Sequence, residues 1–477
     1  MEQAKRIAKN TGFLYARMAI TVFISLYSTR LVLDALGSTD FGIFNVIGGA
    51  IAMLAFLNVA MTQATQRFMS YAEGQGDFKV QVGIFNISVL LHWIIGLAVV
   101  LVLEVAALFL FDGFLEIPED RIYAAKVVYQ CMVFSTFFRI ISVPYDAVIN
   151  AHQNMFLVAV LGVLEAFLKL GIALYLVVAS YDGLITYGVL MALMAVLLLV
   201  IRRIYCFRNY DEVIINIKKY YDRSLLKQMG SFAGWSFLGS STSIVANYGQ
   251  GIVLNVFFGP VVNAAQGIAT QINGQLSAFS TTMLSALNPV IAINEGAGKR
   301  ESMLKMTAMG SKMSFFLLAF MSVPVLVEMP YILNLWLKDV PEYTIIFCRL
   351  LLARTLIEQI TIPVSTSIKA VGKIKGFQIA STILNIIPLV LAYLFFQYGK
   401  PPYYMYIIFI GYSLVNGVVI LWYAKKYTGI NIPNFLVHVV LRCFIALSLG
   451  LLISSIPLYV LDENLVRLMI IVGLSTV

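Results

Sequence analysis

Long apolar runs separated by short polar breaks divide this chain into predicted membrane-spanning segments. Each run has about twenty residues or more, the length that an α-helix needs to cross roughly 30 Å of hydrocarbon. Six runs precede a polar stretch near residues 207–227, and six follow it. The pattern therefore predicts an all-α, polytopic membrane protein. The twelve runs lie near residues 11–33, 41–66, 83–111, 123–148, 154–179, 184–206, 229–257, 262–290, 303–335, 343–370, 374–398 and 402–424.

Two further apolar runs follow these twelve. The thirteenth lies near residues 435–460, and the last, after Asp462 and Glu463, has only about a dozen residues. Because so short a run cannot complete a crossing, we expect the fourteenth helix to be incomplete. The predicted domains are an N-terminal six-helix lobe at 1–206, a cytoplasmic linker at 207–227, a C-terminal six-helix lobe at 228–424 and extra C-terminal helices at 425–477.

Two short motifs occur twice at almost the same offset, which indicates an internal duplication. Glu73-Gly74-Gln75-Gly76 returns in the second half as Glu295-Gly296-Ala297-Gly298. Ile141-Ser142-Val143-Pro144 returns as Ile360-Thr361-Ile362-Pro363, and both prolines are expected to end their spans. An even number of spans per copy gives both copies the same orientation, so we predict parallel repeats. Because the Gly-x-Gly motifs follow no predicted strand, we interpret their glycines as tight-turn residues.

The composition excludes a soluble domain. Hydrophobic residues make up 60% of the chain, charged residues make up 12%, and the mean hydropathy is +0.88, values that a soluble surface does not tolerate. The net charge of +9 lies mostly in short loops between apolar runs, so it indicates orientation and not nucleic-acid binding. The four cysteines lack metal-ligand spacing, and we expect no metal site and no cofactor.

Basic and acidic residues occupy opposite sets of loops. The basic residues precede the first run and fill the middle connection and the later even-numbered loops. The positive-inside bias therefore predicts a cytoplasmic N-terminus. The loops on the other side contain Asp34, Asp40, Asp112, Glu116, Glu119, Asp120, Asp182, Asp339 and Glu342.

The runs at 229–257 and 262–290 are unusually rich in hydroxyl and amide side chains. Such side chains do not face lipid, because their polar atoms need hydrogen-bond partners. They either join helices to one another or line a water-filled cavity that binds hydroxyl-rich cargo, and the number of amides favours the cavity. The candidate sugar-binding residues are Asn247, Gln250, Gln266, Gln271 and Asn273.

The same two runs are free of acidic residues. From Ser224 through Asn294 the sequence has no aspartate or glutamate. A carrier of organic cations needs carboxylates there to hold its cargo and to exchange it for protons or sodium. The absence of carboxylates in these runs therefore disfavours a cation antiporter.

Unpaired arginines inside the spans indicate an anionic cargo. Arg17 and Arg139 have no acidic residue within helical reach along their own spans, and a charge in hydrocarbon requires a bundle interior or a wet cavity. A guanidinium can bind phosphate through two donors at once. We therefore predict that both arginines bind a diphosphate headgroup. At the offset of the repeated Ile-x-x-Pro motif, Arg139 corresponds to Glu358, so the two halves differ in charge.

Two other pairs of charged residues lie four positions apart within a span. Glu165 with Lys169, and Arg354 with Glu358, can each form an ion pair along one helix face. Alternatively, Lys169 contributes to phosphate binding, and the other three are candidates for coupling or gating. Pro388, inside the run at 374–398, is a further gating candidate because proline permits a helix to bend.

Three segments resemble a known family of membrane proteins. They are Thr-Arg-Leu-Val-Leu-Asp-Ala-Leu-Gly-Ser-Thr-Asp-Phe-Gly-Ile-Phe-Asn at 29–45, Thr-Gln-Arg-Phe-Met-Ser-Tyr at 65–71 and Glu-Gly-Gln-Gly-Asp at 73–77. With the span layout and the repeat, they resemble the O-antigen flippase-like oligosaccharide-lipid flippases of the multidrug/oligosaccharidyl-lipid/polysaccharide exporter superfamily. The Leu-Gly-x-x-x-Phe-Gly turn is the most distinctive of these features.

The resemblance implies two six-helix lobes in a V shape, with spans one, two, seven and eight around a central cavity, in the bacterial inner membrane. By position, Arg17, Arg30 and Arg67 fall on the cavity helices of the first lobe, so Arg30 and Arg67 are also candidates for binding phosphate. The implied cargo is an undecaprenyl-diphosphate-linked oligosaccharide, which would move from the cytoplasmic to the periplasmic leaflet. Membrane lipid and the polysaccharide polymerase machinery are the other implied partners.

The sequence thus predicts a flippase for surface polysaccharide or O-antigen synthesis that works by alternating access. The first alternative is a multidrug or cation antiporter of the same superfamily. The second is an enzyme, a polysaccharide polymerase or ligase. The enzyme is disfavoured because the loops on the extracytoplasmic side are short and contain no nucleophile–base set.

Overall fold

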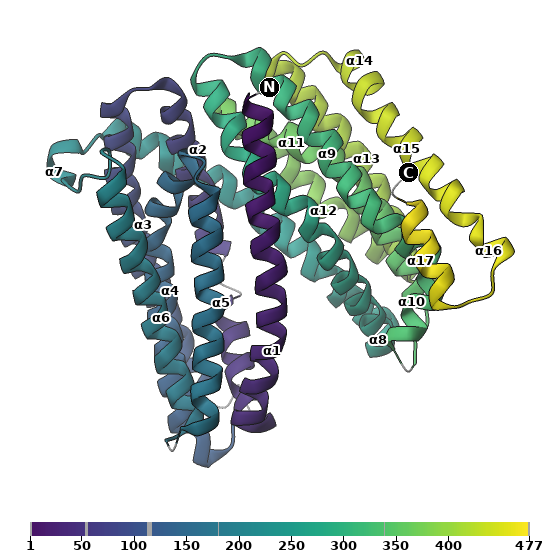
Figure 1. Cartoon of the computed structure of the whole chain (residues 1–477), viewed down its shortest axis with the longest axis horizontal. Coiled ribbons are helices and arrows are strands. Elements are labelled where there is room, and N and C mark those ends of the chain that lie inside the picture. The colour runs from purple at the N-terminus through teal and green to yellow at the C-terminus, as the bar shows by residue number, and fades with distance from the viewer. Residues whose placement is uncertain (1, 53–55, 112–116, 180, 338, 476–477) are drawn as a thin grey trace. The chain divides into compact units, whose positions relative to one another are not determined.

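The computed structural model describes residues 2–52, 56–111, 117–179, 181–337 and 339–475. Within these ranges the regular structure is entirely helical (Figure 1). Ten helical stretches in them are long and apolar enough to cross a membrane. The predicted all-α, polytopic class is confirmed. Two of the acidic residues behind the predicted orientation, Asp112 and Glu116, lie outside the described residues.

The chain folds into two compact units, Met1–Phe237 and Leu238–Val477. The sequence-based boundaries of the lobes and of the linker stay predictions. Helix α8 (Arg223–Gly296) begins in the first unit and continues into the second. The other helices of the first unit are α1 (Glu2–Ala52), α2 (Phe56–Gln75), α3 (Phe78–Phe109), η3 (Glu119–Arg121), α4 (Ile122–Ala151), α5 (Met155–Val178), α6 (Gly183–Asn209) and α7 (Ile217–Tyr220).

The second unit continues with five helices and a C-terminal group. The five are α9 (Arg300–Val327), α10 (Met329–Trp336), α11 (Thr344–Val371), α12 (Lys375–Gln397) and α13 (Tyr404–Thr428). The C-terminal group contains α14 (Ile432–Phe435), the π-helix η4 (Leu436–Leu441), α15 (Arg442–Ser455), α16 (Pro457–Val460) and α17 (Leu465–Leu474).

One glycine divides each of the two longest helices between its predicted spans. Gly37 interrupts α1 with φ 74° and ψ 170°, and Gly259 interrupts α8 with φ 78° and ψ −172°. This region of backbone conformation is accessible essentially to glycine alone. The two breaks are separated by the same stretch of sequence as the two copies of the Glu-Gly-x-Gly motif.

Two further pairs of left-handed residues follow the same duplication. Gly76 and Gly298, which close the repeated motifs, have φ of 69° and 70°, so the predicted tight-turn role is confirmed for these two; it is wrong for Gly74 and Gly296, which lie within α2 and α8. Gln153, after α4, has φ 54°, and Gly372, after α11, has φ 90°; these two positions share the offset of Pro144 and Pro363. The duplication is therefore visible in the backbone as well as in the sequence, although Gln153 adopts this conformation without the freedom of glycine.

The prediction that Pro144 and Pro363 end their spans is wrong. Helix α4 continues past Pro144 to Ala151, and α11 continues past Pro363 to Val371. A proline removes one backbone hydrogen bond, and a membrane helix can compensate through neighbouring helices and local adjustments of the turn. Pro388 likewise lies buried inside α12.

Small residues let the helices of each unit pack closely. In the first unit α1 lies along α5, and α4 lies along α6. A Cβ on Gly188 of α6 would come within 3.0 Å of Val128 on α4, and a Cβ on Gly310 of α9 would overlap the side chain of Leu287 on α8. Such contacts are typical of helix pairs in membranes, while large apolar side chains such as Leu108 stay exposed on the outer faces.

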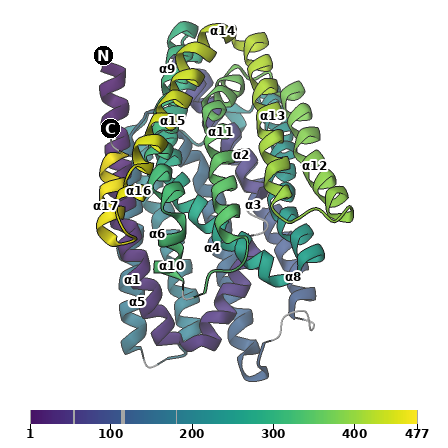
Figure 2. The same ribbon diagram turned by 90° about the vertical axis from the view of Figure 1, so that its right-hand side faces the viewer.

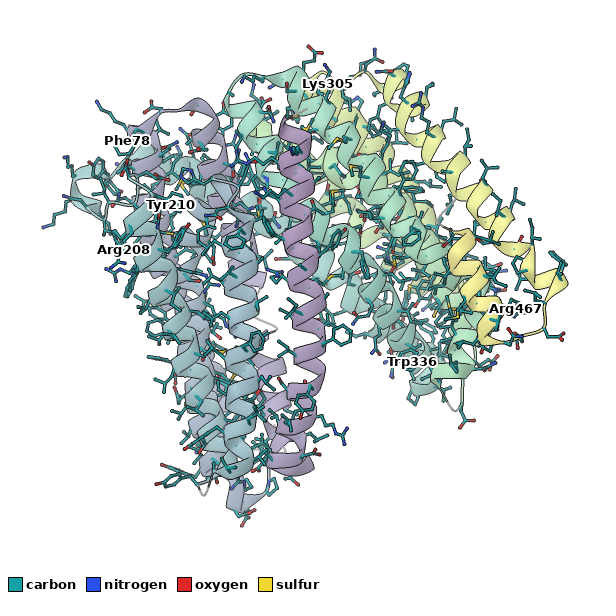
Figure 3. The ribbon with its side chains drawn as sticks, viewed as in Figure 1. Phe78, Arg208, Tyr210, Lys305, Trp336 and Arg467 are labelled. Carbon is teal, nitrogen blue, oxygen red and sulfur yellow. The ribbon has the colours of Figure 1, made fainter. Side chains whose placement is uncertain are left out.

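A buried ion pair fastens the last helix to the second unit. Arg467 of α17 donates to both carboxylate oxygens of Glu328, which lies between α9 and α10, at 2.5 and 2.8 Å. Both side chains are almost fully buried. Helix α15 also packs along α9; both helices are labelled in Figures 1 and 2, and Figure 3 labels Arg467 on α17. The short fourteenth segment is therefore a packed part of the second unit.

Candidate functional site

In the first unit, the central part of α5 presents charges on one face. Lys169 Nζ lies 2.8 Å from Glu165 Oε1, which confirms that these residues can pair along the helix. Gly162 is one turn before Glu165 on the same face. Since Lys169 leaves 41% of its side chain exposed in the middle of a membrane helix, this face needs water or a polar ligand beside it.

Arg17 of α1 lies against this face of α5. A Cβ on Gly162 would come within 2.5 Å of Arg17 Cδ, so the missing side chain of Gly162 provides the space for the arginine stem. Among the described residues, the Arg17 guanidinium has no hydrogen-bond or ion-pair partner. The N–H donors of this guanidinium are therefore available to bind a ligand.

Helices α4 and α6 add three more charges. Arg202 Nε donates to Asp146 Oδ1 at 2.8 Å, and Arg139 and Arg202 both interact electrostatically with Glu165. Arg139 thus has an acidic neighbour on α5, although none lies within reach on its own helix. The charge cluster of the first unit consists of Arg17, Arg139, Asp146, Glu165, Lys169 and Arg202.

The charge cluster has a surplus of positive charge, since its four cations face two carboxylates. Sequence reasoning did not single out Asp146 or Arg202 as candidate site residues. The spacing of Asp146 offered a signal, because it lies two helical turns after Arg139 and so on the same face of α4. Partial exposure of charged groups within membrane-spanning helices is a feature of residues that line wet cavities.

Arg30 and Arg67, the other two phosphate candidates, lie outside the charge cluster. Arg30 is 81% exposed and its Nε lies 3.9 Å from Asp34 Oδ2. The Arg67 guanidinium lies over the rings of Phe68, Tyr71 and Phe232, at 4.7, 4.6 and 5.8 Å from their centroids. Cation–π contacts of this kind hold an arginine in place, so Arg67 is anchored within the first unit.

The second unit contains the other predicted ion pair. Arg354 Nε donates to Glu358 Oε1 at 2.8 Å, which confirms the pairing along α11. Ser413 Oγ of α13 donates to the same oxygen at 2.6 Å, and the Arg354 guanidinium lies 4.5 Å from the centroid of the Phe409 ring. The pair therefore also connects α11 with α13.

Asn385 of α12 is the centre of a neutral polar network. Its Nδ2 donates to Ser243 Oγ at 3.0 Å and to Thr242 Oγ1 at 3.4 Å, both on α8, and Tyr412 of α13 donates its hydroxyl hydrogen to Asn385 Oδ1. Asn385 lies one turn before Pro388, so the network holds α12 next to its proline. Sequence reasoning missed this residue, although an amide one turn before the proline of this run was a usable signal.

The candidate sugar-binding amides lie in different environments. Gln250 is buried and donates to the carbonyl oxygen of Ala246 in its own helix at 3.1 Å. Asn247 and Gln271 are exposed, and Gln266 Oε1 lies near Gly251. Asn273 Oδ1 is buried and accepts no hydrogen bond from a described residue. Their role in sugar binding stays a prediction.

The described residues contain no group of three or more histidine, cysteine, aspartate or glutamate side chains that could hold a metal ion.

Comparisons with known proteins establish the fold. No family model and no curated protein matches the sequence. Solved structures do match: a crystal structure of a MATE point mutant has a TM-score of 0.76 at 15% identity. An outward-facing multidrug resistance MATE family transporter of the MOP superfamily matches with a TM-score of 0.73 at 15% sequence identity. A MOP superfamily transporter from Pyrococcus furiosus matches with a TM-score of 0.70 at 16% sequence identity. Its binding pocket is described as having reverse polarity, which suggests a different function.

Each of these three matches covers 89% of this chain and 96% of the other. The chain therefore has the two-lobed helical fold of MATE transporters. At such low identity the likeness concerns the fold alone, and the side chains of this chain determine its cargo.

Proposed function

We propose that this chain is a multi-pass membrane transporter that uses the MATE-type fold. The observation that carries the proposal is the match to transporter structures over 89% of the chain, with TM-scores up to 0.76. The partly exposed charges in its membrane helices support a polar pathway for cargo.

The comparisons favour a multidrug antiporter over a flippase as the more specific function. One of the matching structures is described as a multidrug resistance MATE family transporter. On the fold alone, export of organic cations in exchange for an ion is the better supported of the two candidates.

A flippase for a lipid-linked oligosaccharide is the second candidate, and the charges of this chain favour it. Residues 224–294 contain no carboxylate to hold an organic cation, and the charge cluster of the first unit has more cations than anions. Arginines in such a cluster are suited to a diphosphate. The reverse pocket polarity described for the Pyrococcus furiosus protein supports the view that this fold accommodates cargoes of different charge.

A reconstitution experiment separates the two candidates. The purified chain in liposomes is offered a fluorescent organic cation in one arm and a polyprenyl-diphosphate oligosaccharide in the other. Accumulation of the cation supports the antiporter, and movement of the lipid between leaflets supports the flippase. Transport of neither cargo by correctly folded protein contradicts both.

Charge removal tests the role of the charge cluster. We expect Arg17→Gln and Arg139→Gln each to lower lipid movement about tenfold or more, because a hydrogen bond to a charged group contributes about 1.5–3 kcal/mol. Lys305→Gln is the matched control, since Lys305 pairs with Glu301 on an exposed surface. If lipid moves between the leaflets at the same rate in both arginine variants and in the control, the arginines do not bind cargo.

A further inference from the structure

The segment after α6 is fastened to the first unit. Glu212 and Val213 are 5% and 3% exposed. Asn86 of α3 donates its Nδ2 hydrogen to the carbonyl oxygen of Ile214 at 2.7 Å, and its Oδ1 accepts from the backbone N–H of Asn216 at 2.8 Å. Residues 210–216 are therefore a bound part of the first unit, although they belong to the predicted linker between the lobes.

His152, in the turn between α4 and α5, holds this segment at one end. Its Nε2 lies 2.6 Å from Glu212 Oε1, and its ring stacks on Tyr210 with centroids 4.3 Å apart. Its Nδ1 lies 3.5 Å from Oε1 of Glu73, the acid of the first Glu-Gly-x-Gly motif. Figure 3 labels Tyr210 near the end of the first unit that also carries Phe78. The imidazole thus bridges a carboxylate of the linker and a carboxylate of α2.

The remaining polar groups around the imidazole come from three other elements. Arg6 of α1 donates to the carbonyl oxygen of His152 at 2.9 Å, and Gln81 of α3 donates to Glu73 Oε2 at 3.0 Å. The amide of Asn154 donates to the hydroxyls of Tyr205 and Tyr210. Glu73, Glu212 and Arg6 are therefore the charged groups that face His152.

The bridge is complete only when the imidazole is charged. A neutral imidazole can still donate its one N–H to Glu212, whereas an imidazolium donates this hydrogen bond and also carries the positive charge that attracts Glu73. Burial lowers the pKa of His152, but the hydrogen bond to Glu212 and the charges of Glu73 and Glu212 outweigh burial and the repulsion from Arg6, so the pKa is raised. The bridge is thus fully formed below the ordinary histidine value of about 6.5 and is lost as pH rises through the raised value.

We propose that protonated His152 is a latch that holds residues 210–216 on the first unit, and that its deprotonation frees them. Freed, residues 210–216 would loosen the connection from α6 to α8, whose first part also belongs to the first unit. The latch is thus a property of the first unit and does not rest on the proposed transport function.

The second unit has a related contact without a titratable base. Arg300 Nε donates to Oε2 of Glu295, the acid of the second Glu-Gly-x-Gly motif, at 2.9 Å, and Arg300 Nη1 donates to the carbonyl oxygen of Tyr427 at 3.0 Å. Arginine keeps its charge at every physiological pH. The second copy of the motif therefore provides an internal control that does not respond to pH.

The first experiment measures the titration of His152. The chain has three histidines, so NMR of the full-length protein with isotope-labelled histidine gives few signals, and His152→Gln identifies the one of interest. We expect a midpoint above 6.5 that falls when Glu212→Gln removes the acceptor charge. A midpoint at or below 6.5, unchanged in Glu212→Gln, would overturn the proposal.

The second experiment measures the release of the segment. Hydrogen exchange of residues 210–216, corrected for the intrinsic pH dependence, is compared with residues 296–300 between pH 6 and pH 9. We expect protection of 210–216 to fall at least tenfold across this range, and protection of 296–300 to stay constant. In Glu212→Gln and His152→Gln the protection should be low at all pH values.

Constant protection of 210–216 in the unsubstituted protein, or full protection in both variants, would refute the latch. Neither measurement needs cargo. Failure of the transport proposal therefore leaves the latch testable, and failure of the latch leaves the transport proposal standing.

Discussion

At the scale of single residues, the partners of an ionisable side chain depend on how deeply it is buried. Glu328 and Arg467, which are almost fully buried, form a bidentate pair. Lys169 is partly exposed, and Arg17 has free donors, within membrane-spanning helices. A fully buried charge requires an opposite charge, whereas a partly exposed one can serve a ligand.

The buried pair gives a stability prediction. Glu328→Gln leaves the Arg467 guanidinium buried without its counter-charge, and we expect the free energy of unfolding to fall by about 3–5 kcal/mol. The double variant Glu328→Leu with Arg467→Leu should recover most of it, because an apolar pair needs no desolvation of charge. Denaturation of the purified protein in detergent measures both variants.

Glu301→Gln is the control for this prediction, since Glu301 pairs with Lys305 on an exposed surface. It should leave the denaturation midpoint unchanged. If Glu328→Gln behaves like the control, the buried pair does not stabilise the second unit.

At the scale of elements, glycine conformation sets where the long helices break. Gly37 and Gly259 divide α1 and α8 at corresponding points of the two copies. A Cβ on either glycine would meet no atom within 4 Å. Any effect of a side chain at these positions must therefore come from backbone strain and not from a clash.

We predict that Gly37→Ala and Gly259→Ala destabilise the protein by similar amounts. Their backbone conformation disfavours every residue with a Cβ, at a cost of about 1–3 kcal/mol. Gly267→Ala, in a regular and open part of α8, should be neutral or stabilise by up to about 1 kcal/mol. Thermal unfolding followed by size-exclusion chromatography compares the three variants, and equal unfolding temperatures would contradict the strain argument.

At the scale of the whole molecule, one duplicated backbone carries two different sets of side chains. Three pairs of residues with positive φ, Gly37 with Gly259, Gly76 with Gly298 and Gln153 with Gly372, match at the offsets of the two repeated sequence motifs. The first copy places a surplus of cations around α5, and the second places an ion pair and the neutral network of Asn385 at the corresponding helices. Duplication thus preserved the helix layout while the chemistry of the two copies diverged.

The predicted orientation of the whole chain is tested by cysteine labelling. Asp120→Cys and Lys218→Cys place thiols at exposed positions, while Cys206, Cys348 and Cys443 are buried. We expect a membrane-impermeant reagent to label position 120 in intact cells and position 218 only after permeabilisation, because basic loops stay in the cytoplasm. The opposite labelling pattern would reverse the predicted topology.

Much of this architecture follows from local sequence patterns. Apolar runs of about twenty residues determine the helices, the repeated motifs determine the duplication, and spacing of four positions determines the pairs Glu165–Lys169 and Arg354–Glu358. Each of these features depends on neighbours along one helix, whose geometry is regular. Local patterns failed at Pro144 and Pro363, because surrounding structure allows a helix to continue through proline.

The tertiary structure alone decided which distant side chains meet. The contact of Arg17 with Gly162, the pair of Asp146 with Arg202, the pair of Glu328 with Arg467 and the bridge from His152 to Glu212 each join different elements. Such contacts depend on how far each helix is rotated and shifted against its neighbour, and no local period encodes these two quantities. The sequence by itself determined a duplicated helical membrane protein, and packing determined which of its charges are paired.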